Sequence, residues 1–368
     1  MKNSLRATLK RGSMAGVATA GAAALLLTGC GAAPSSSGAS GSATKSDYTA
    51  CMVSDSGGFD DKSFNQSGYE GLQSAVKDLG IQEKHVQSKA DTDYDPNLRS
   101  MVQQGCKLTV TVGFLLGDAT KSIATANPNS HFAIIDYNDP AFPKNVKPIV
   151  YNTAQAAFLA GYLAAGTSKT GKVATFGGLN IPPVTIYMDG FWEGVQYYNK
   201  QKSKTVKVLG WDEKNQKGGT FAQSFTDQNQ GKQISQTFIQ QGADIIFPVA
   251  GGTGLGAGAA AQASGGKANV IWVDTDGCES AAQYCSVFLT SVTKNLSDSV
   301  KEYVTKAASG SFPSGSYVGT LANNGTGLAP FHDFDSKIPS DLKSELKQVQ
   351  SDITSGKIKI TSPSQPAS

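Results

Sequence analysis

Apolar residues near the start of the chain form a continuous run and then recur at helical spacing. Residues 50–53 predict a buried strand, and the glycine-rich segment 55–62 predicts a loop. Ser63, followed three residues later by Gln66, has the pattern of a capping box, so we expect a helix to begin there and to end at Gly80. The strand end and the helix start are therefore predicted to lie together, where open α/β sheets bind ligands.

The same alternation of strand and helix patterns continues along most of the chain. Further strands are expected over residues 108–114, 131–135, 173–176, 206–209, 244–249 and 270–273. Helical patterns separate most of them, which predicts parallel sheets with helices on both faces. We expect an α/β protein with two doubly wound, Rossmann-like lobes. The last part of the chain has too few strands for a third lobe, so it is expected to complete both.

Polar side chains follow several of the predicted strands. Asp55 comes after the first strand, Asp136 follows the strand at 131–135, and Asn65 lies in the first turn of the first predicted helix. An ionised carboxylate only accepts hydrogen bonds, whereas an amide both donates and accepts. Asp55 and Asn65 can therefore recognise polar groups of a base or sugar, and Asp136 is placed to accept from a base N–H.

A glycine-rich turn, residues 251–256, follows the predicted strand at 244–249. Gly252, Gly254 and Ala257 partly match a dinucleotide fingerprint, but this turn lies in the second lobe and the expected compartment has no ready pool of NAD. The turn has no Lys-Ser or Lys-Thr, so it is not a phosphate-binding P-loop. The glycines can instead let the main chain approach a ligand, with Gly252 as the candidate contact, or they can form a tight strand-to-helix turn. Both of these interpretations stay open.

The excess of positive charge lies in the first 11 residues. The chain has 32 Lys and Arg against 29 Asp and Glu, but four of the basic residues belong to this leader. The rest of the chain is nearly neutral, which argues against a nucleic-acid-binding protein.

After the basic leader comes an apolar run, residues 15–27, and then Leu-Thr-Gly-Cys, which resembles a bacterial lipobox. We expect residues 1–29 to be a lipoprotein signal peptide and Cys30 to carry the lipid. Residues 30–47, rich in Ser, Gly and Ala, then form a flexible tether. The protein is expected to be extracytoplasmic and anchored to the bacterial cell membrane.

Four cysteines follow the lipobox, an even number that is typical of disulfides outside the cell. Cys51 lies in the first predicted strand and Cys106 just before the one expected to be its parallel neighbour, so this pair is geometrically reasonable. Cys278 and Cys285 flank one loop and suggest a second bridge. Four cysteines allow three pairings, and free buried thiols are the alternative.

Catalytic and metal-binding patterns find little support. Residues 54–58 resemble a serine-protease motif, but no histidine precedes them to act as a base. The histidines, His85, His131 and His332, have no metal-ligand spacing, and residues 60–61 fit a helix cap or a surface turn better than a metal site. We expect no catalytic residue, no metal and no cofactor.

The segment D-S-G-G-F-D-D-K-S-F-N-Q, residues 55–66, with G-Y-E-G-L after it, resembles the signature of the basic membrane protein family. The stretches 134–136, 190–195 and 242–247 are also similar to that family. The family comprises nucleoside-binding lipoproteins of ABC transporters. The resemblance implies the type I periplasmic binding protein fold, in which three crossovers join two lobes and the ligand lies in the cleft. We expect one lobe over residues 48–152 and 286–318 and the other over 153–285 and 319–368.

The resemblance also implies roles for individual residues. It assigns Phe64 to stacking on a purine, Asp55 and Asn65 to polar contacts nearby, and Asp274 and Lys294 to the ribose hydroxyls. The alternatives are that Phe64 is a core residue and that Lys294 is a solvated residue in the first turn of a helix. A second aromatic wall is expected from the other lobe, with three candidates, Phe221, Phe225 and Phe247.

We therefore expect a monomeric, lipid-anchored receptor that closes on a purine nucleoside and presents it to an ABC transporter permease. A receptor of the same fold for a sugar or polyol is one alternative. An extracellular nucleoside hydrolase and a sensory or structural surface lipoprotein are others.

Overall fold

The computed structural model describes residues 47–313 and 315–366. The expected signal peptide, Cys30 and nearly all of the expected tether lie outside the described residues. Across the described ranges, no helix combines the length and the apolar character needed to cross a bilayer.

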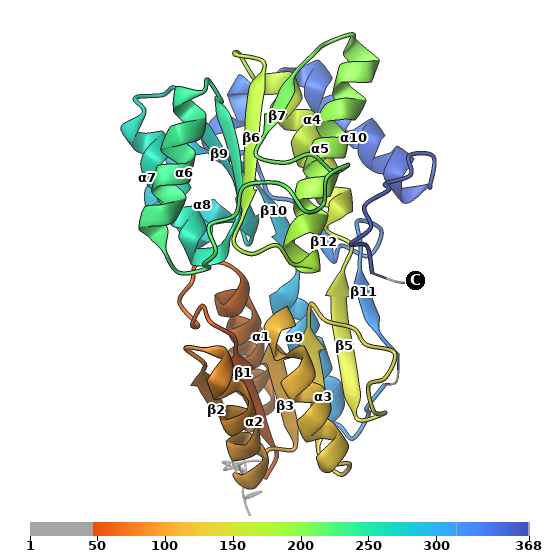
Figure 1. Ribbon diagram of the computed structural model, residues 1–368. Coiled ribbons are helices and arrows are strands. Elements are labelled where there is room, and N and C mark those ends of the chain that lie inside the picture. The colour runs from red at the N-terminus through yellow and green to blue at the C-terminus, as the bar shows by residue number, and fades with distance from the viewer. Residues whose placement is uncertain (1–46, 314, 367–368) are drawn as a thin grey trace, which may run out of the picture. The chain divides into compact units, whose positions relative to one another are not determined.

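The first lobe is built on a six-stranded sheet in the order β11-β5-β4-β3-β1-β2 (Figure 1). All of its neighbouring strands are parallel. The strands are β1 (Thr49–Ser54), β2 (Gln82–Gln87), β3 (Leu108–Val112), β4 (His131–Ile135), β5 (Val146–Tyr151) and β11 (Tyr317–Gly319). Its helices are α1 (Phe64–Leu79), α2 (Tyr94–Gln103), α3 (Gly117–Ala126) and α9 (Leu296–Ala308).

Side chains of β1 alternate between two apolar cores, one on each face of the first sheet. Ala50 and Met52 pack in a cluster with residues of α1 and α9, such as Leu72 and Val300. Their neighbours in β1 belong to a second cluster that includes residues of α2 and α3. Helices therefore cover both faces, as the continuous apolar run of this strand predicts.

The second lobe contains another six-stranded sheet, in the order β12-β10-β9-β8-β6-β7. Only the pair β10 and β12 is antiparallel among the described strands of this sheet. The strands are β6 (Lys172–Gly177), β7 (Lys207–Leu209), β8 (Ile245–Val249), β9 (Asn269–Asp274), β10 (Phe288–Lys294) and β12 (Thr326–Leu328).

Helices cover the second sheet on both faces as well. Residues of α4 (Ala154–Thr167), α5 (Pro182–Lys202) and α10 (Ser340–Thr354) share one apolar cluster. On the other face lie α6 (Gln228–Gln240), α7 (Leu255–Ala263) and the short α8 (Gly277–Ser280), as Figure 1 shows. Short 3-10 helices lie at Asp91–Asp93, Phe114–Leu116, Gly251–Gly254, Ala282–Val287 and His332–Lys337.

The described chain passes between the two sheets three times. The first passage follows β5, at Asn152, and the third lies between β11 and β12. The second follows β10, at Asn295, because β10 pairs with β9 and β12 in the second sheet. The expectation that residues 286–294 belong to the first lobe is therefore wrong. An apolar run predicts a strand, but it does not say which of two similar sheets the strand will join.

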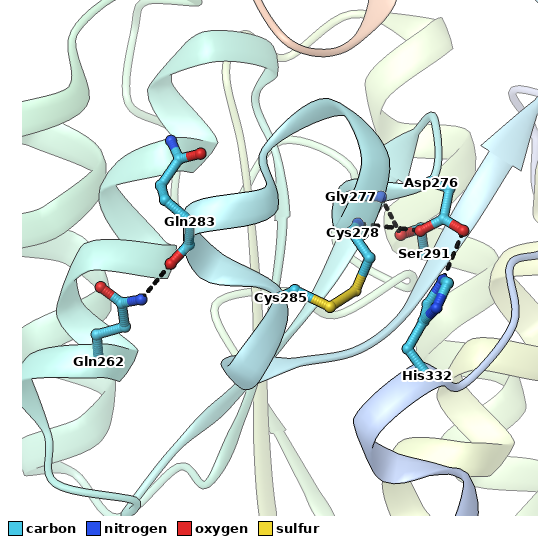
Figure 2. The surroundings of a disulfide bond; sticks show 8 residues. All are labelled: Gln262, Asp276, Gly277, Cys278, Gln283, Cys285, Ser291 and His332. Atoms are coloured by element: carbon cyan, nitrogen blue, oxygen red, sulfur yellow. Dashed lines mark hydrogen bonds and ion pairs between the residues drawn. A yellow bond between two sulfur atoms is a disulfide. The ribbon is translucent and has the colours of Figure 1, made fainter.

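Both predicted disulfides are present. Cys51 and Cys106 join β1 to the turn before β3, with their Cα atoms 5.8 Å apart, and both residues are buried. Cys278 and Cys285 close the loop after β9, with Cα atoms 4.5 Å apart (Figure 2). The first bridge ties distant parts of the first lobe together, whereas the second is local to one loop.

Candidate functional site

Residues of both lobes line one cavity at the carboxyl ends of the sheet strands. The first lobe contributes Asp55, Asp61, Phe64, Asn65, Gly113, Phe114 and Asp136. The second contributes the start of α5 with Tyr187, the ends of β8 and β9 with Asp274, and also Phe225, Gly251 and Lys294. Six of the seven residues selected from the sequence therefore meet in one place.

Lys294 is buried at the centre of this site. Its side chain is 2% exposed, and its Nζ lies 2.6 Å from Asp136 Oδ2 and 3.8 Å from Asp274 Oδ1. The ammonium also lies 4.8 Å from the ring centre of Phe64 and 5.3 Å from that of Tyr187. Two carboxylates and the faces of aromatic rings thus compensate a charge that would be costly to bury alone. Lys294 ends a strand, so its interpretation as a solvated helix residue is wrong.

Asp136 and Asp274 hold matching positions in the two lobes. Asp136 directly follows β4 and Asp274 ends β9, which is the corresponding strand in the order of the second sheet. Both have φ of 67°, in the left-handed region that non-glycine residues seldom adopt. Such strain is often found at functional sites. Burial raises the pKa of Asp136, and the neighbouring Lys294 ammonium partly opposes this shift.

Two hydroxyl groups hold the carboxylate of Asp274. Tyr187 donates to its Oδ1 at 2.7 Å, and Ser63 donates to its Oδ2 at 2.6 Å. Tyr187 belongs to α5 of the second lobe, whereas Ser63 precedes α1 of the first. The carboxylate is therefore bound from both sides of the cavity.

Asp55 and Asn65 form a polar pair on the first-lobe side of the cavity. Asn65 Nδ2 donates to Asp55 Oδ1 at 3.1 Å, while the buried Asn65 Oδ1 has no hydrogen-bond partner among the described residues. Burial raises the pKa of Asp55 to about 7. Gly113, with φ of 124°, lies so close that a Cβ atom there would be 2.0 Å from Asp55 Oδ2. The pair offers buried acceptor atoms that suit the N–H or O–H groups of a ligand.

The first helix is capped by Asp61 and not by Ser63. Asp61 Oδ1 accepts from the backbone N–H groups of Ser63 and Gln66, both at 3.0 Å, and Oδ2 accepts from that of Asn65 at 2.9 Å. The predicted capping box is therefore wrong, because a carboxylate two residues upstream satisfies the same donors and also suits the positive end of the helix dipole. The expectation that residues 60–61 provide a helix cap is confirmed for Asp61. Burial raises the pKa of Asp61 to about 6.

Phe225 is the aromatic candidate that lines the cavity from the second lobe. Phe247 is fully buried in the core, with its ring centre 5.1 Å from that of Phe191. Phe221 packs edge-on against Trp211. Phe64, on the first-lobe side, lines the same cavity and also packs against the core of its own lobe.

Gly252 does not line the cavity, although its neighbour Gly251 does. A Cβ atom at Gly252 would lie 3.2 Å from the carbonyl oxygen of Phe225 and 3.9 Å from that of Asp61. Residues 251–254 form a 3-10 turn that leads into α7. The tight-turn interpretation therefore describes this segment, and Gly252 lets main chain of the second lobe approach Asp61.

Asp61, Gly113, Phe114 and Tyr187 are among the residues of the cavity that were not selected from the sequence. Gly113 and Phe114 end the strand predicted over residues 108–114, so their position at the end of a strand was a usable signal. Tyr187 lies inside α5, and the sequence pattern of this helix does not show which of its buried residues line the cavity.

One group of potential metal ligands occurs in the described part of the chain, formed by Asp276, Cys278 and His332. The sulfur of Cys278 is bound to Cys285, so it cannot act as a thiolate ligand. Asp276 Oδ2 instead lies 2.7 Å from His332 Nε2. Figure 2 shows these two side chains pointing toward each other.

Two doubly wound lobes that share a cavity at the ends of their strands define the two-lobed fold of periplasmic binding proteins. Residues 48–362 match the family described as Bmp, ABC transporter substrate-binding protein PnrA-like, and the chain belongs to this family. It is thus an ABC transporter substrate-binding protein, in a family of binding proteins rather than enzymes.

Relatives and solved structures agree with this assignment. The chain is 32% identical to the ABC transporter nucleoside-binding protein BmpA of Lactococcus lactis, over 96% of this chain and 100% of that protein. It is 29% identical to basic membrane protein A1 of Borrelia garinii, over 82% and 85% of the two chains. A solute-binding protein of an ABC transporter system from Aeropyrum pernix has the same fold, with a TM-score of 0.78, 24% identity and coverage of 86% and 94%.

Proposed function

We propose that this protein binds a purine nucleoside between its two lobes and presents it to the permease of an ABC transporter. The observation that carries the proposal is the composition of the cavity. Aromatic rings from both lobes, Phe64 and Phe225, occur together with unpaired or weakly paired acceptors and with a buried charge cluster. The similarity to a relative named as nucleoside-binding supports the same ligand class.

The base is proposed to lie between Phe64 and Phe225. Stacking of a nucleobase on an aromatic side chain contributes about 1–3 kcal/mol in other proteins. Asn65 Oδ1 and the carboxylate of Asp55 then accept hydrogen bonds from N–H groups on the edge of the base. The hydroxyl groups of a sugar alone can also donate to these acceptors, but a sugar has no flat aromatic ring to stack between Phe64 and Phe225.

The ribose is proposed to lie beside Lys294 and Asp274, with the ammonium donating to the hydroxyl groups and the carboxylate accepting from them. We place Asp136 with this group, because it holds Lys294 at 2.6 Å. Asp136 as an acceptor for the base, the role expected from the sequence, is the alternative within this proposal.

A panel of ligands tests the proposal on the purified, unlipidated protein. Inosine, guanosine and adenosine are each expected to raise the melting temperature, because a ligand that binds only the native state stabilises it. Cytidine, hypoxanthine and ribose serve as the comparisons. Calorimetry then gives the affinities of the ligands that stabilise the protein.

The outcomes separate the alternatives. Stabilisation by ribose equal to that by inosine would instead favour the sugar or polyol receptor. Chromatography of the inosine sample after incubation tests the hydrolase, since free hypoxanthine must appear if the bond to the base is broken. A protein that responds to none of the ligands would refute the proposal.

We also propose that Cys30 carries the lipid anchor and that the monomeric protein acts outside the cytoplasm. The substitution Cys30→Ala in the full chain is expected to abolish incorporation of a labelled fatty acid, which the wild-type protein incorporates. Labelling of the variant at the wild-type level would contradict the anchor.

A further inference from the structure

Two side chains of the second lobe donate to a single carbonyl group of the first. Trp272 Nε1 lies 3.3 Å from the carbonyl oxygen of Lys62, and Thr275 Oγ1 lies 3.2 Å from the same atom. Lys62 has φ of 61°, in the left-handed region, and stands between the helix cap Asp61 and Ser63. None of Lys62, Trp272 and Thr275 is among the residues that line the cavity.

The second lobe holds the indole of Trp272 in one position. Trp272 is fully buried, and its ring stacks on that of Phe288, with centres 5.4 Å apart and planes at 23°. A Cβ atom at Gly277 would lie 2.9 Å from the ring, and one at Gly254 would lie 3.1 Å from it. Because the indole is fixed, its N–H can donate to the carbonyl group of Lys62 only when the first lobe is positioned against the second.

The segment after Thr275 is also fixed within the second lobe, as Figure 2 shows. Asp276 pairs with His332 at 2.7 Å and accepts from the backbone N–H of Cys278 at 3.0 Å. The backbone N–H of Gly277 donates to Ser291 Oγ at 3.0 Å. The disulfide from Cys278 closes the same loop. These contacts hold the backbone next to Thr275 in place, so Thr275 does not need to reorganise when the lobes meet.

We propose that Trp272 and Thr275 form a closure latch on Lys62, which holds the lobes together around a ligand that neither residue touches. The latch rests on the proposed function, since it acts on binding of a nucleoside between the lobes. Its hydrogen bonds exist only while the two lobes are in contact, so they stabilise the closed state alone. Apparent affinity rises with the population of the binding-competent state, whatever the ligand is.

A closure latch and a direct contact with the ligand predict different effects of mutation on nucleoside affinity. Loss of one latch hydrogen bond is expected to weaken the binding of every nucleoside by the same factor. A typical net hydrogen bond corresponds to a loss of about fivefold in affinity. The change is expected in the dissociation rate, because broken interlobe contacts speed opening while encounter with the open cleft is unaffected.

Trp272→Phe is the decisive variant, because it keeps a stacked ring and removes the N–H group. Trp211→Phe is the matched control, since the Trp211 indole donates to Asp189 Oδ1 at 2.9 Å within the second lobe. Thr275→Val is a second test, which removes the other donor at similar side-chain volume, together with the contact of Thr275 Oγ1 to Ser280 Oγ at 2.8 Å. Affinities and dissociation rates are measured with inosine and adenosine, after circular dichroism has shown that each variant is folded.

An equal loss for both nucleosides with Trp272→Phe and Thr275→Val, absent from Trp211→Phe, supports the latch. Unchanged affinity, or a loss that differs between the two nucleosides, overturns it. If wild type binds neither nucleoside, the proposed function fails, and small-angle X-ray scattering of the ligand-free proteins decides the latch alone. A larger radius of gyration for Trp272→Phe than for wild type and Trp211→Phe then supports the latch, and equal radii overturn it.

Discussion

Asp55 illustrates, at the scale of one residue, how burial changes the chemistry of a side chain. The residue is 8% exposed, and loss of water around its carboxylate raises its pKa to about 7, with a hydrogen bond from Asn65 opposing the shift. Nearby acids, Asp61 and Asp136, add to the increase by repulsion. A group with this pKa changes its charge near neutral pH, so it can make both stability and binding depend on pH.

Stability is expected to fall with rising pH because of Asp55. In the unfolded chain the carboxyl loses its proton near its ordinary value of 3.8, whereas in the folded protein it keeps the proton up to about 7. Between these values the native state binds more protons, so the free energy of unfolding decreases as pH rises. Asp55→Asn should flatten this slope between pH 5 and pH 7. Urea unfolding at several pH values measures it.

The exposed neighbour Asp60 provides the control for this experiment, since Asp60→Asn changes the same charge outside the buried site. Burial also raises the pKa of Asp61. Asp61 is present in both variants, so it contributes equally to the pH dependence of their stability. The difference between the Asp55 and Asp60 variants therefore isolates Asp55. Identical slopes in the two variants would contradict the assigned shift.

At the scale of an element, α1 links helix capping to the site. The carboxylate of Asp61 receives three backbone N–H groups at the start of the helix, which places Phe64 and Asn65 on its first turn. Ser63, the expected cap, is thereby free to donate across the cavity to Asp274. One carboxylate thus positions two side chains that line the cavity and leaves a third free for contact with the other lobe.

Asp61→Ala is expected to lower the free energy of unfolding by about 1–2 kcal/mol, as loss of a helix cap does in other proteins. Ser63→Ala should have a smaller effect on stability, because the cap remains, and should instead weaken nucleoside binding. Denaturant unfolding and calorimetry of both variants separate the two effects. A greater loss of stability in Ser63→Ala than in Asp61→Ala would restore the capping-box interpretation.

At the scale of the whole molecule, the site exists only where the two lobes meet. Asp136 belongs to the first lobe and Lys294 to the end of β10 in the second, so their ion pair joins the lobes directly. Asp274 lies 3.8 Å from the same ammonium. Closure therefore gathers two carboxylates around one cation, and the cation is needed to make that arrangement favourable.

Lys294→Met is expected to weaken nucleoside binding by at least tenfold, because closure would then bring two carboxylates together without a compensating charge. Loss of one partner of a buried, hydrogen-bonded charge pair commonly costs about 2–5 kcal/mol in binding. Adding Asp136→Asn to Lys294→Met should recover part of the affinity by removing one of the unpaired charges. Calorimetry of the single and double variants measures the coupling. Additive losses would show that the pair does not act as a unit.

Local patterns were sufficient for the strand and helix alternation and for the position of most polar site residues. Asp55 and Asp136 were found because parallel strands end at one edge of a sheet, so residues that follow such strands converge. The role of Asp274 came instead from the resemblance to the family. The pairs of cysteines followed from the same reasoning about neighbouring strands and loops. These inferences needed only short-range periodicity and the rules of strand order.

Other features depend on contacts between segments far apart in the chain. The place of β10 in the second sheet, the burial of Lys294 and the choice of Phe225 over Phe247 arise from long-range packing. The raised pKa of Asp55 likewise depends on how much water the surrounding fold removes. Periodicity reports which side of an element is apolar, but the partner that covers it, and hence the local dielectric and charge, is set only when the chain has folded.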